Sequence, residues 1–243
     1  MTTRPPTSFN LGRASFIAGA FFCVVVLSAA AVHADRHEAT QSPTSFAGQA
    51  VVVDGDTIDV GGQRIRLEGI DAPEVAQVCQ RADGRDWPCG RVAVKALKAL
   101  IGSNEVVCDS AGADKYGRVL AICFADGRDL NASMVTAGLA WAFVRYSQTY
   151  AGEEAIARKA LVGVWSGTAQ APWDFRQNGW KTAEAVAPKG CAIKGNVSSK
   201  GQIYHMPWSP WYGRVTVDVR RGEHWFCSES EAKAAGWRPA QAF

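Results

Sequence analysis

Acidic side chains crowd one short stretch of the sequence. The run VVVDGDTIDVGGQRIRLEGIDAPE, residues 51–74, contains Asp54, Asp56, Asp59, Asp71 and Glu74. Asp-Gly and Asp-Ala-Pro-Glu are ordinary turn sequences, so these carboxylates are either turn residues or ligands. Hard divalent cations such as calcium take several oxygen ligands from carboxylates, backbone carbonyls and water. Because acids at both ends of one strand meander can converge, the spacing is compatible with a cation site.

Two arginines could supply the complementary chemistry. Arg66 lies on the strand that leads to Asp71 and Glu74, and Arg118 opens a later strand after DKYG. Guanidinium groups form paired hydrogen bonds with phosphate oxygens and stabilise negative charge that develops in a reaction. A cation, two arginines and a carboxylate that accepts a proton from water are the parts that phosphodiester cleavage requires. The alternative for Arg66 is an exposed strand residue paired with a neighbouring acid.

Alternating apolar residues predict the strands that must position these groups. We expect strands at QAVVVD (49–54), TIDV (57–60), QRIRLEGI (63–70), EVVCD (105–109) and RVLAICF (118–124). Helical spacing of apolar residues predicts helices over 90–102, 130–140 and 150–165. The sequence therefore predicts a five-stranded barrel with about three helices packed outside it.

The N-terminus has the pattern of a targeting segment. Arg4 and Arg13 precede the apolar run 16–32, and small residues follow it up to Ala34. This predicts a signal peptide over residues 1–34 and a polar tether over 35–47, hence an exported protein, periplasmic or extracellular. An uncleaved membrane anchor is the alternative. Cleavage removes two arginines and no acid, so the net charge falls from +3 to +1 and any attraction to phosphate must be local.

Cysteine usage agrees with export. Six of the seven cysteines lie outside the apolar run, and an even number in an oxidising compartment indicates disulfides. Proximity in the chain favours the pairs Cys79–Cys89, Cys108–Cys123 and Cys191–Cys227. Zinc is the rival occupant of these thiols, although the sequence contains no CxxC pair.

The sequence predicts that the C-terminal part is a separate small unit. Residues 169–188 are expected to be a linker, and residues 189–243 a small α+β module stapled by Cys191–Cys227. Its expected strands are QIYHM (202–206), RVTVDV (214–219) and HWFC (224–227), followed by a helix capped by Ser228 or Ser230.

Several of these motifs together resemble one known family. VVDGDTIDV, RIRLEGIDAPE, DKYGRVLA, GLAWAFVRY and GVWS resemble the thermonuclease, or staphylococcal nuclease-like, family across residues 48–168. The resemblance implies an oligonucleotide-binding (OB) fold and calcium dependence. It also implies an endonuclease that hydrolyses DNA and RNA to products with 3′-phosphates.

The resemblance also implies residue roles. Asp56 and Asp71 match calcium carboxylates, and Ala72 matches a position that binds calcium through its backbone carbonyl and often holds threonine in the family. Asp54 matches a turn acid behind these ligands, and Glu74 matches the general base. Further matches are the phosphate-binding arginines Arg66 and Arg118, the nucleotide-contacting loop residues Lys115 and Tyr116, and Tyr146 near the sugar. Val144 replaces a neighbouring family tyrosine.

The C-terminal unit resembles a short module of secreted bacterial proteins, including nuclease-like proteins of rhizobial exopolysaccharide gene clusters. Its aromatic residues suggest contact with a glycan or the cell wall, whereas a tiny domain also fills its core with large rings. Trp208 and Trp211, in a loop with prolines, are the expected exposed rings. The leading hypothesis is a nuclease with a nucleic-acid substrate and no obligate protein partner. The alternative is a noncatalytic envelope or exopolysaccharide-associated binding protein on a nuclease-like barrel.

Overall fold

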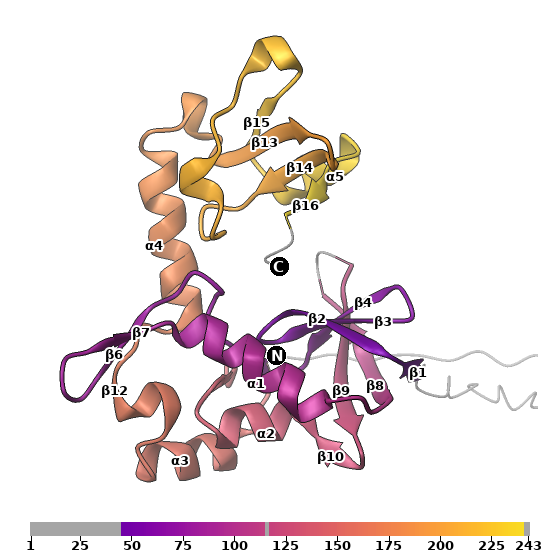
Figure 1. Cartoon of the computed structure of the whole chain (residues 1–243), viewed down its shortest axis with the longest axis vertical. Helices are drawn as coiled ribbons and strands as arrows, with labels where there is room; N and C mark the ends of the chain where they lie inside the picture. The colour runs from indigo at the N-terminus through magenta and orange to yellow at the C-terminus, as the bar shows by residue number, and fades with distance from the viewer. Residues whose placement is uncertain (1–44, 115–116, 241–243) are drawn as a thin grey trace, which may run out of the picture. The chain divides into compact units, whose positions relative to one another are not determined.

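The computed structural model describes residues 45–114 and 117–240 (Figure 1). The expected signal peptide, most of the tether, Lys115 and Tyr116 lie outside these residues. Within the described ranges, no helix is long and apolar enough to cross a membrane. The described residues all belong to one compact unit.

One mixed sheet forms the framework of the N-terminal part. Its strands are β1 (Ser45–Gly48), β2 (Ala50–Asp54), β3 (Thr57–Val60), β4 (Gln63–Leu67), β8 (Val106–Ala113), β9 (Val119–Ala125) and β10 (Arg128–Asp129). Strands β2, β3 and β4 form an antiparallel meander, β4 runs parallel to β9, and β9 runs antiparallel to β8. These five strands are the ones that the alternating pattern predicts.

The expected closed five-stranded barrel is not what the hydrogen bonding shows. The sheet has seven strands, because β1 adds to β8 and β10 adds to β9. Its main path is β1-β8-β9-β4-β3-β2, and no pairing in the described residues joins β1 to β2. The physical reason is that β1, which pairs with the outer edge of β8 along Val106–Asp109, leads into β2 through the single residue Gln49, so covalent chain and not a strand ladder joins the two ends of the sheet.

Three helices lie outside this sheet, as expected; the first two pack against its strands and the third packs against the second helix. They are α1 (Cys89–Ile101), α2 (Leu130–Thr136) and α3 (Ala151–Lys159), followed by the 3-10 turn η1 (Gly163–Ser166). Leu97 of α1 is fully buried in one core with Ile65 and Leu67 of β4. Since side chains alternate along a strand, burial of Ile65 and Leu67 turns Arg64 and Arg66 to the opposite face.

Short strand pairs shape the chain between β4 and α1. Strand β5 (Ile70–Asp71) pairs with β11 (Trp141–Ala142), and β6 (Cys79–Arg81) lies between β7 (Asp86–Trp87) and β12 (Gly167–Thr168).

Three disulfides form, Cys79–Cys89, Cys108–Cys123 and Cys191–Cys227, so zinc does not hold these thiols.

The segment expected to be a linker contains a helix, α4 (Pro172–Glu184), which begins with proline at its first position. The 3-10 turn η2 (Pro188–Gly190) then leads into a four-stranded sheet (Figure 1). This sheet has the order β15 (His224–Phe226), β13 (Ile193–Ser198), β14 (Gly201–His205) and β16 (Arg238–Pro239). Helix α5 (Glu229–Ala234) starts at Ser228, whose hydroxyl accepts a hydrogen bond from the Glu231 N–H.

The prediction of one strand in this module is wrong. Most of RVTVDV is irregular, between the 3-10 turns η3 (Tyr212–Arg214) and η4 (Val219–Arg221), and β13 takes the place in the sheet instead. Asp218 explains part of the difference, because its carboxylate accepts from the Arg220 N–H and stabilises a turn.

The small core of the C-terminal module makes its disulfide important. The core has five buried residues, Ile193, Tyr204, Phe226, Ala232 and Trp237. A bridge that closes a loop of this length contributes about 4 kcal/mol in the chain-entropy description. We therefore expect the double variant Cys191→Ser/Cys227→Ser to lose hydrogen-exchange protection in β13 and β14 while β3 and β4 keep theirs. Unchanged protection in β13 would contradict this assignment of stability.

Candidate active site

The turn between β2 and β3 faces strand β4 directly. Asp54 ends β2, Asp56 lies in the turn, and Thr57 is the register partner of Arg66. The Leu67 N–H donates to the Asp56 carbonyl oxygen at 2.8 Å. This backbone contact ties the turn to β4 and brings the Asp56 carboxylate to the Arg66 side chain.

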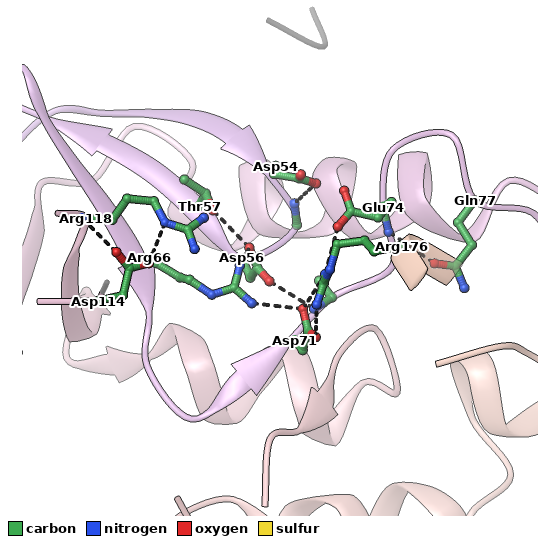
Figure 2. A network of polar contacts seen from close by, with 12 residues as sticks. Asp54, Asp56, Thr57, Arg66, Asp71, Glu74, Gln77, Asp114, Arg118 and Arg176 are labelled. Atoms are coloured by element: carbon green, nitrogen blue, oxygen red, sulfur yellow. Dashed lines mark hydrogen bonds and ion pairs between the residues drawn. The ribbon is translucent and has the colours of Figure 1, made fainter. Parts of the chain in front are cut away.

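Arg66 bridges the two aspartates that the family resemblance assigns to calcium (Figure 2). Its Nη1 lies 2.8 Å from Asp56 Oδ1, and its Nη2 lies 2.9 Å from Asp71 Oδ1. The Asp71 side chain is completely buried and that of Asp56 is 5% exposed. Buried carboxylates without a partner are strongly destabilising, so Arg66 stabilises the fold by neutralising both aspartates.

Arg118 lies on the same face as Arg66. Leu120 is the parallel register partner of Arg66, and Arg118 precedes Leu120 by two residues, which keeps its side chain on that face. Arg118 Nε contacts Asp114 Oδ2 at 2.7 Å. Arg66, Arg118 and Glu74 all line one cavity of 750 Å³. The two guanidinium groups therefore converge on the carboxylate side of the sheet.

Glu74 is held by a buried glutamine that the sequence analysis missed. Gln77 is 1% exposed, and its Oε1 accepts from the Glu74 N–H at 3.3 Å while its Nε2 donates to the Gln170 carbonyl at 2.6 Å. The Gln77 N–H donates to the Glu74 carbonyl at 2.7 Å. A buried glutamine with these partners fixes the backbone of Glu74 from both sides.

A glycine also limits the position of Glu74. Gly90, the second residue of α1, packs so closely that a β-carbon there would lie 1.7 Å from the Glu74 carbonyl oxygen. The Cys79–Cys89 disulfide closes the intervening loop and holds the start of α1 beside it. Only glycine fits this approach, so the start of α1 forms a wall behind the Glu74 backbone.

A third arginine, also missed from the sequence, completes the network. Arg176 of α4 binds Asp71 through two bonds, Nη1 to Oδ1 at 3.0 Å and Nη2 to Oδ2 at 2.7 Å, and its Nη1 lies 2.8 Å from Glu74 Oε1 (Figure 2). The sequence does contain a signal for helix α4, because Trp173, Arg176 and Trp180 recur at helical spacing in the segment interpreted as a linker.

Acids outnumber arginines at the centre of the network. Asp54, Asp56, Asp71 and Glu74 surround the guanidinium groups of Arg66 and Arg176, while Arg118 pairs with Asp114. Burial, followed by repulsion from Glu74 and Asp56, raises the pKa of Asp54 well above its ordinary value. Burial raises the pKa of Glu74 to about 7 against the attraction of Arg176. Burial also acts on Asp56, but Arg66 and the Ala72 N–H outweigh it and lower the Asp56 pKa.

The chemistry of these donors fits a hard divalent cation. Asp56 and Asp71 offer carboxylate oxygens beside the backbone of Ala72, and the mutual repulsion that raises the pKa of Asp54 would be relieved by added positive charge. No cluster of three or more acidic, histidine or cysteine ligands is preformed among the described residues. Arg66 and Arg176 instead bind the carboxylate oxygens, so a cation that binds Asp71 would have to displace a guanidinium group.

The other predicted substrate contacts are placed in part. Tyr146 is 75% exposed and lines the same cavity as Arg66 and Arg118. Its ring packs against Phe143, which stacks on Trp173 of α4. Val144 is exposed and offers no aromatic face beside Tyr146.

The aromatic residues of the C-terminal module serve mostly as core. Tyr204, Phe226 and Trp237 are buried, whereas Trp211 is 39% exposed. Trp208 is partly buried and lines the cavity that contains Arg66.

Comparison with known proteins identifies the family of this chain. A family model described as staphylococcal nuclease homologue matches residues 64–167. The succinoglycan biosynthesis protein ExoI of Rhizobium meliloti is 35% identical over 166 residues, which cover 67% of this chain and 82% of that protein. The chain belongs to the staphylococcal nuclease homologue family. The micrococcal nuclease of Shigella flexneri is 35% identical over 54% of this chain and 81% of its own length.

Another relative aligns with less than half of this chain. The staphylococcal-like nuclease CAN1 of Arabidopsis thaliana is 33% identical over 47% of this chain and 33% of its own length. A second family model, described as ArfC, matches residues 178–239. Arg176 lies between the two matched regions, so neither family pattern includes it.

The close approach at Gly90 gives a test with a matched control. Gly90 and Gly152 are each the second residue of a helix, but a β-carbon at Gly152 would meet nothing within 4 Å. We expect Gly90→Ala to lower the free energy of unfolding by about 1–3 kcal/mol because of overpacking against Glu74. Gly152→Ala should raise it by up to about 1 kcal/mol because alanine favours the helix. Urea unfolding measures both, and equal effects would rule out the proposed wall.

Proposed function

We propose that this protein is an exported, calcium-dependent phosphodiesterase that cleaves DNA, RNA or both. The observation that supports it best is the convergence of Arg66, Arg118 and Glu74 on one cavity beside two buried aspartates. The nuclease relatives support the same reaction class. Three disulfides and the N-terminal apolar run support export to an oxidising compartment.

In the proposed reaction, Glu74 accepts a proton from the attacking water. Its pKa of about 7 lies close to neutral pH, where a carboxylate is an effective general base. Water attacks phosphorus in line with the 5′ oxygen; the bond from phosphorus to that oxygen breaks, the 5′ oxygen takes up a proton from solvent, and the phosphate stays on the 3′ oxygen. Arg66 and Arg118 hold the equatorial phosphate oxygens, where negative charge is greatest in the transition state.

Calcium would be held by Asp56, Asp71 and the Ala72 carbonyl, with Asp54 behind them. When bound, it supplies charge neutralisation on the phosphate and helps to orient water. Tyr146 would contact the sugar, and Lys115 and Tyr116 the terminal phosphate and base. We propose residues 48–168 as the nuclease domain and residues 189–243 as the accessory module, joined by a segment that includes α4.

A noncatalytic role is the second candidate. It is favoured by the relative named as a succinoglycan biosynthesis protein, which aligns with 67% of this chain. In that case the nuclease-like part would keep its carboxylates and arginines as structural ion pairs, and the protein would act in the envelope or in exopolysaccharide assembly. The partly exposed Trp211 is the ring that a glycan could reach.

Arg118 and Arg64 form a matched pair of variants. Arg118 pairs with Asp114 and Arg64 pairs with Asp59, but among the described residues Arg64 is not part of the cavity lining. We expect Arg118→Ala to lower kcat on single-stranded DNA by about 10²–10³, because one donor to the transition state is lost. Arg64→Ala should keep the kcat of the unaltered protein, and calcium affinity should change little in either variant. Full turnover by Arg118→Ala would remove Arg118 from the reaction.

Glu74→Gln and a chelator separate the two candidate functions. The glutamine keeps the shape of the side chain but cannot accept a proton, so we expect kcat to fall by about 10²–10⁴. Chelation of calcium should abolish cleavage by the unaltered protein, and added calcium should restore it. If the unaltered protein cleaves neither DNA nor RNA with calcium, the noncatalytic role is favoured instead.

A further inference from the structure

We propose that Arg176 is a positioning residue of the active site, a tethered cation that holds the Asp71 carboxylate until a divalent cation binds and displaces it. The inference rests on the proposed function, because it concerns the residues expected to bind calcium. Arg176 would therefore set the calcium concentration at which the site becomes active.

The contacts of Asp71 carry this inference. Arg66 and Arg176 both bind Asp71 Oδ1, and Arg176 also binds Oδ2, so both oxygens already have cationic donors. The Asp71 side chain is completely buried, which leaves no exposed carboxylate surface for an additional ligand. A cation that binds Asp71 must therefore exchange with at least one guanidinium group.

Displacement of Arg176 from Asp71 costs less free energy than displacement of Arg66. The Arg66 side chain is 14% exposed and remains bonded to Asp56, whose carboxylate would otherwise lose its guanidinium partner. The Arg176 side chain is 23% exposed, borders the cavity and also contacts Glu74. Release from Asp71 moves Arg176 toward solvent and leaves Glu74 as its acidic partner.

Helix α4 keeps Arg176 close enough to compete. One turn before it, Trp173 stacks on Phe143 with ring centroids 5.5 Å apart and planes inclined by 16°. Just ahead of α4, the Gln170 carbonyl accepts from Gln77, the residue that holds Glu74. Because the helix is anchored at these points, the guanidinium group stays at a high effective concentration beside Asp71.

Competition between Arg176 and the cation for Asp71 predicts that loss of Arg176 raises the affinity for calcium. Loss of a residue that merely supports the fold weakens cation binding, whereas loss of a competing cation strengthens it. Charge-assisted hydrogen bonds of the kind that Arg176 makes are strong enough to change an affinity about tenfold. We therefore expect Arg176→Gln to bind calcium about tenfold more tightly than the unaltered protein.

Calorimetric titration of calcium into the chain from residue 35 onward measures this affinity without any substrate. Lys181→Gln is the matched control, because it removes one positive charge from an exposed position of the same helix. Arg176→Lys serves if the glutamine variant does not fold. Lysine keeps the charge but cannot form two parallel bonds to one carboxylate, so a smaller gain in affinity is expected.

Each outcome decides the inference. Tighter binding by Arg176→Gln with no change in Lys181→Gln supports it. Unchanged or weaker binding by Arg176→Gln overturns it, and so does an equal gain in both variants, which would reflect net charge alone. If the unaltered protein cleaves DNA with calcium but Arg176→Gln has the same affinity, only this inference fails. If the unaltered protein and Arg176→Gln bind no calcium, the inference fails, and absence of cleavage then overturns the proposed function as well.

Discussion

Burial of the Asp71 carboxylate is the constraint on which the site depends. A charged carboxylate removed from water is tolerated only with close countercharge and hydrogen-bond donors. Here Arg66 and Arg176 provide both, and they come from positions that are far apart in the sequence. The strand meander and helix α4 must therefore be in place together for this one carboxylate to be neutralised.

The meander and its acids were predictable because their causes are local. Alternating apolar residues determine which side of β4 faces the core, and this fixes the direction of Arg66. The interaction of Arg66 with Asp56 follows from a short turn and the strand register, over ten residues. Arg176 was not predictable in this way, because it meets Asp71 across 105 residues of sequence, and no local pattern specifies such a pair.

The C-terminal module shows why alternation alone can mislead. RVTVDV has β-branched residues at alternate positions, yet Asp218 and Glu223 bind nearby backbone N–H groups and hold the chain in turns. Strand β13 was missed because it contains Gly195, which usually indicates a break in a strand. A β-carbon there would lie 2.7 Å from the rings of Phe226 and Trp237, so the glycine makes room for the aromatic core.

Helix α4 gives the accessory module a physical connection to the chemistry. Trp173, near its start, packs against Phe143 of the nuclease-like part, and Trp180, farther along, packs against the core of the C-terminal module. Arg176 lies between these two anchors, and rotation of the helix would change its distance to Asp71. Trp180 therefore connects the core of the C-terminal module to the helix that carries Arg176, and a change in the packing of that core would reach the candidate site through α4.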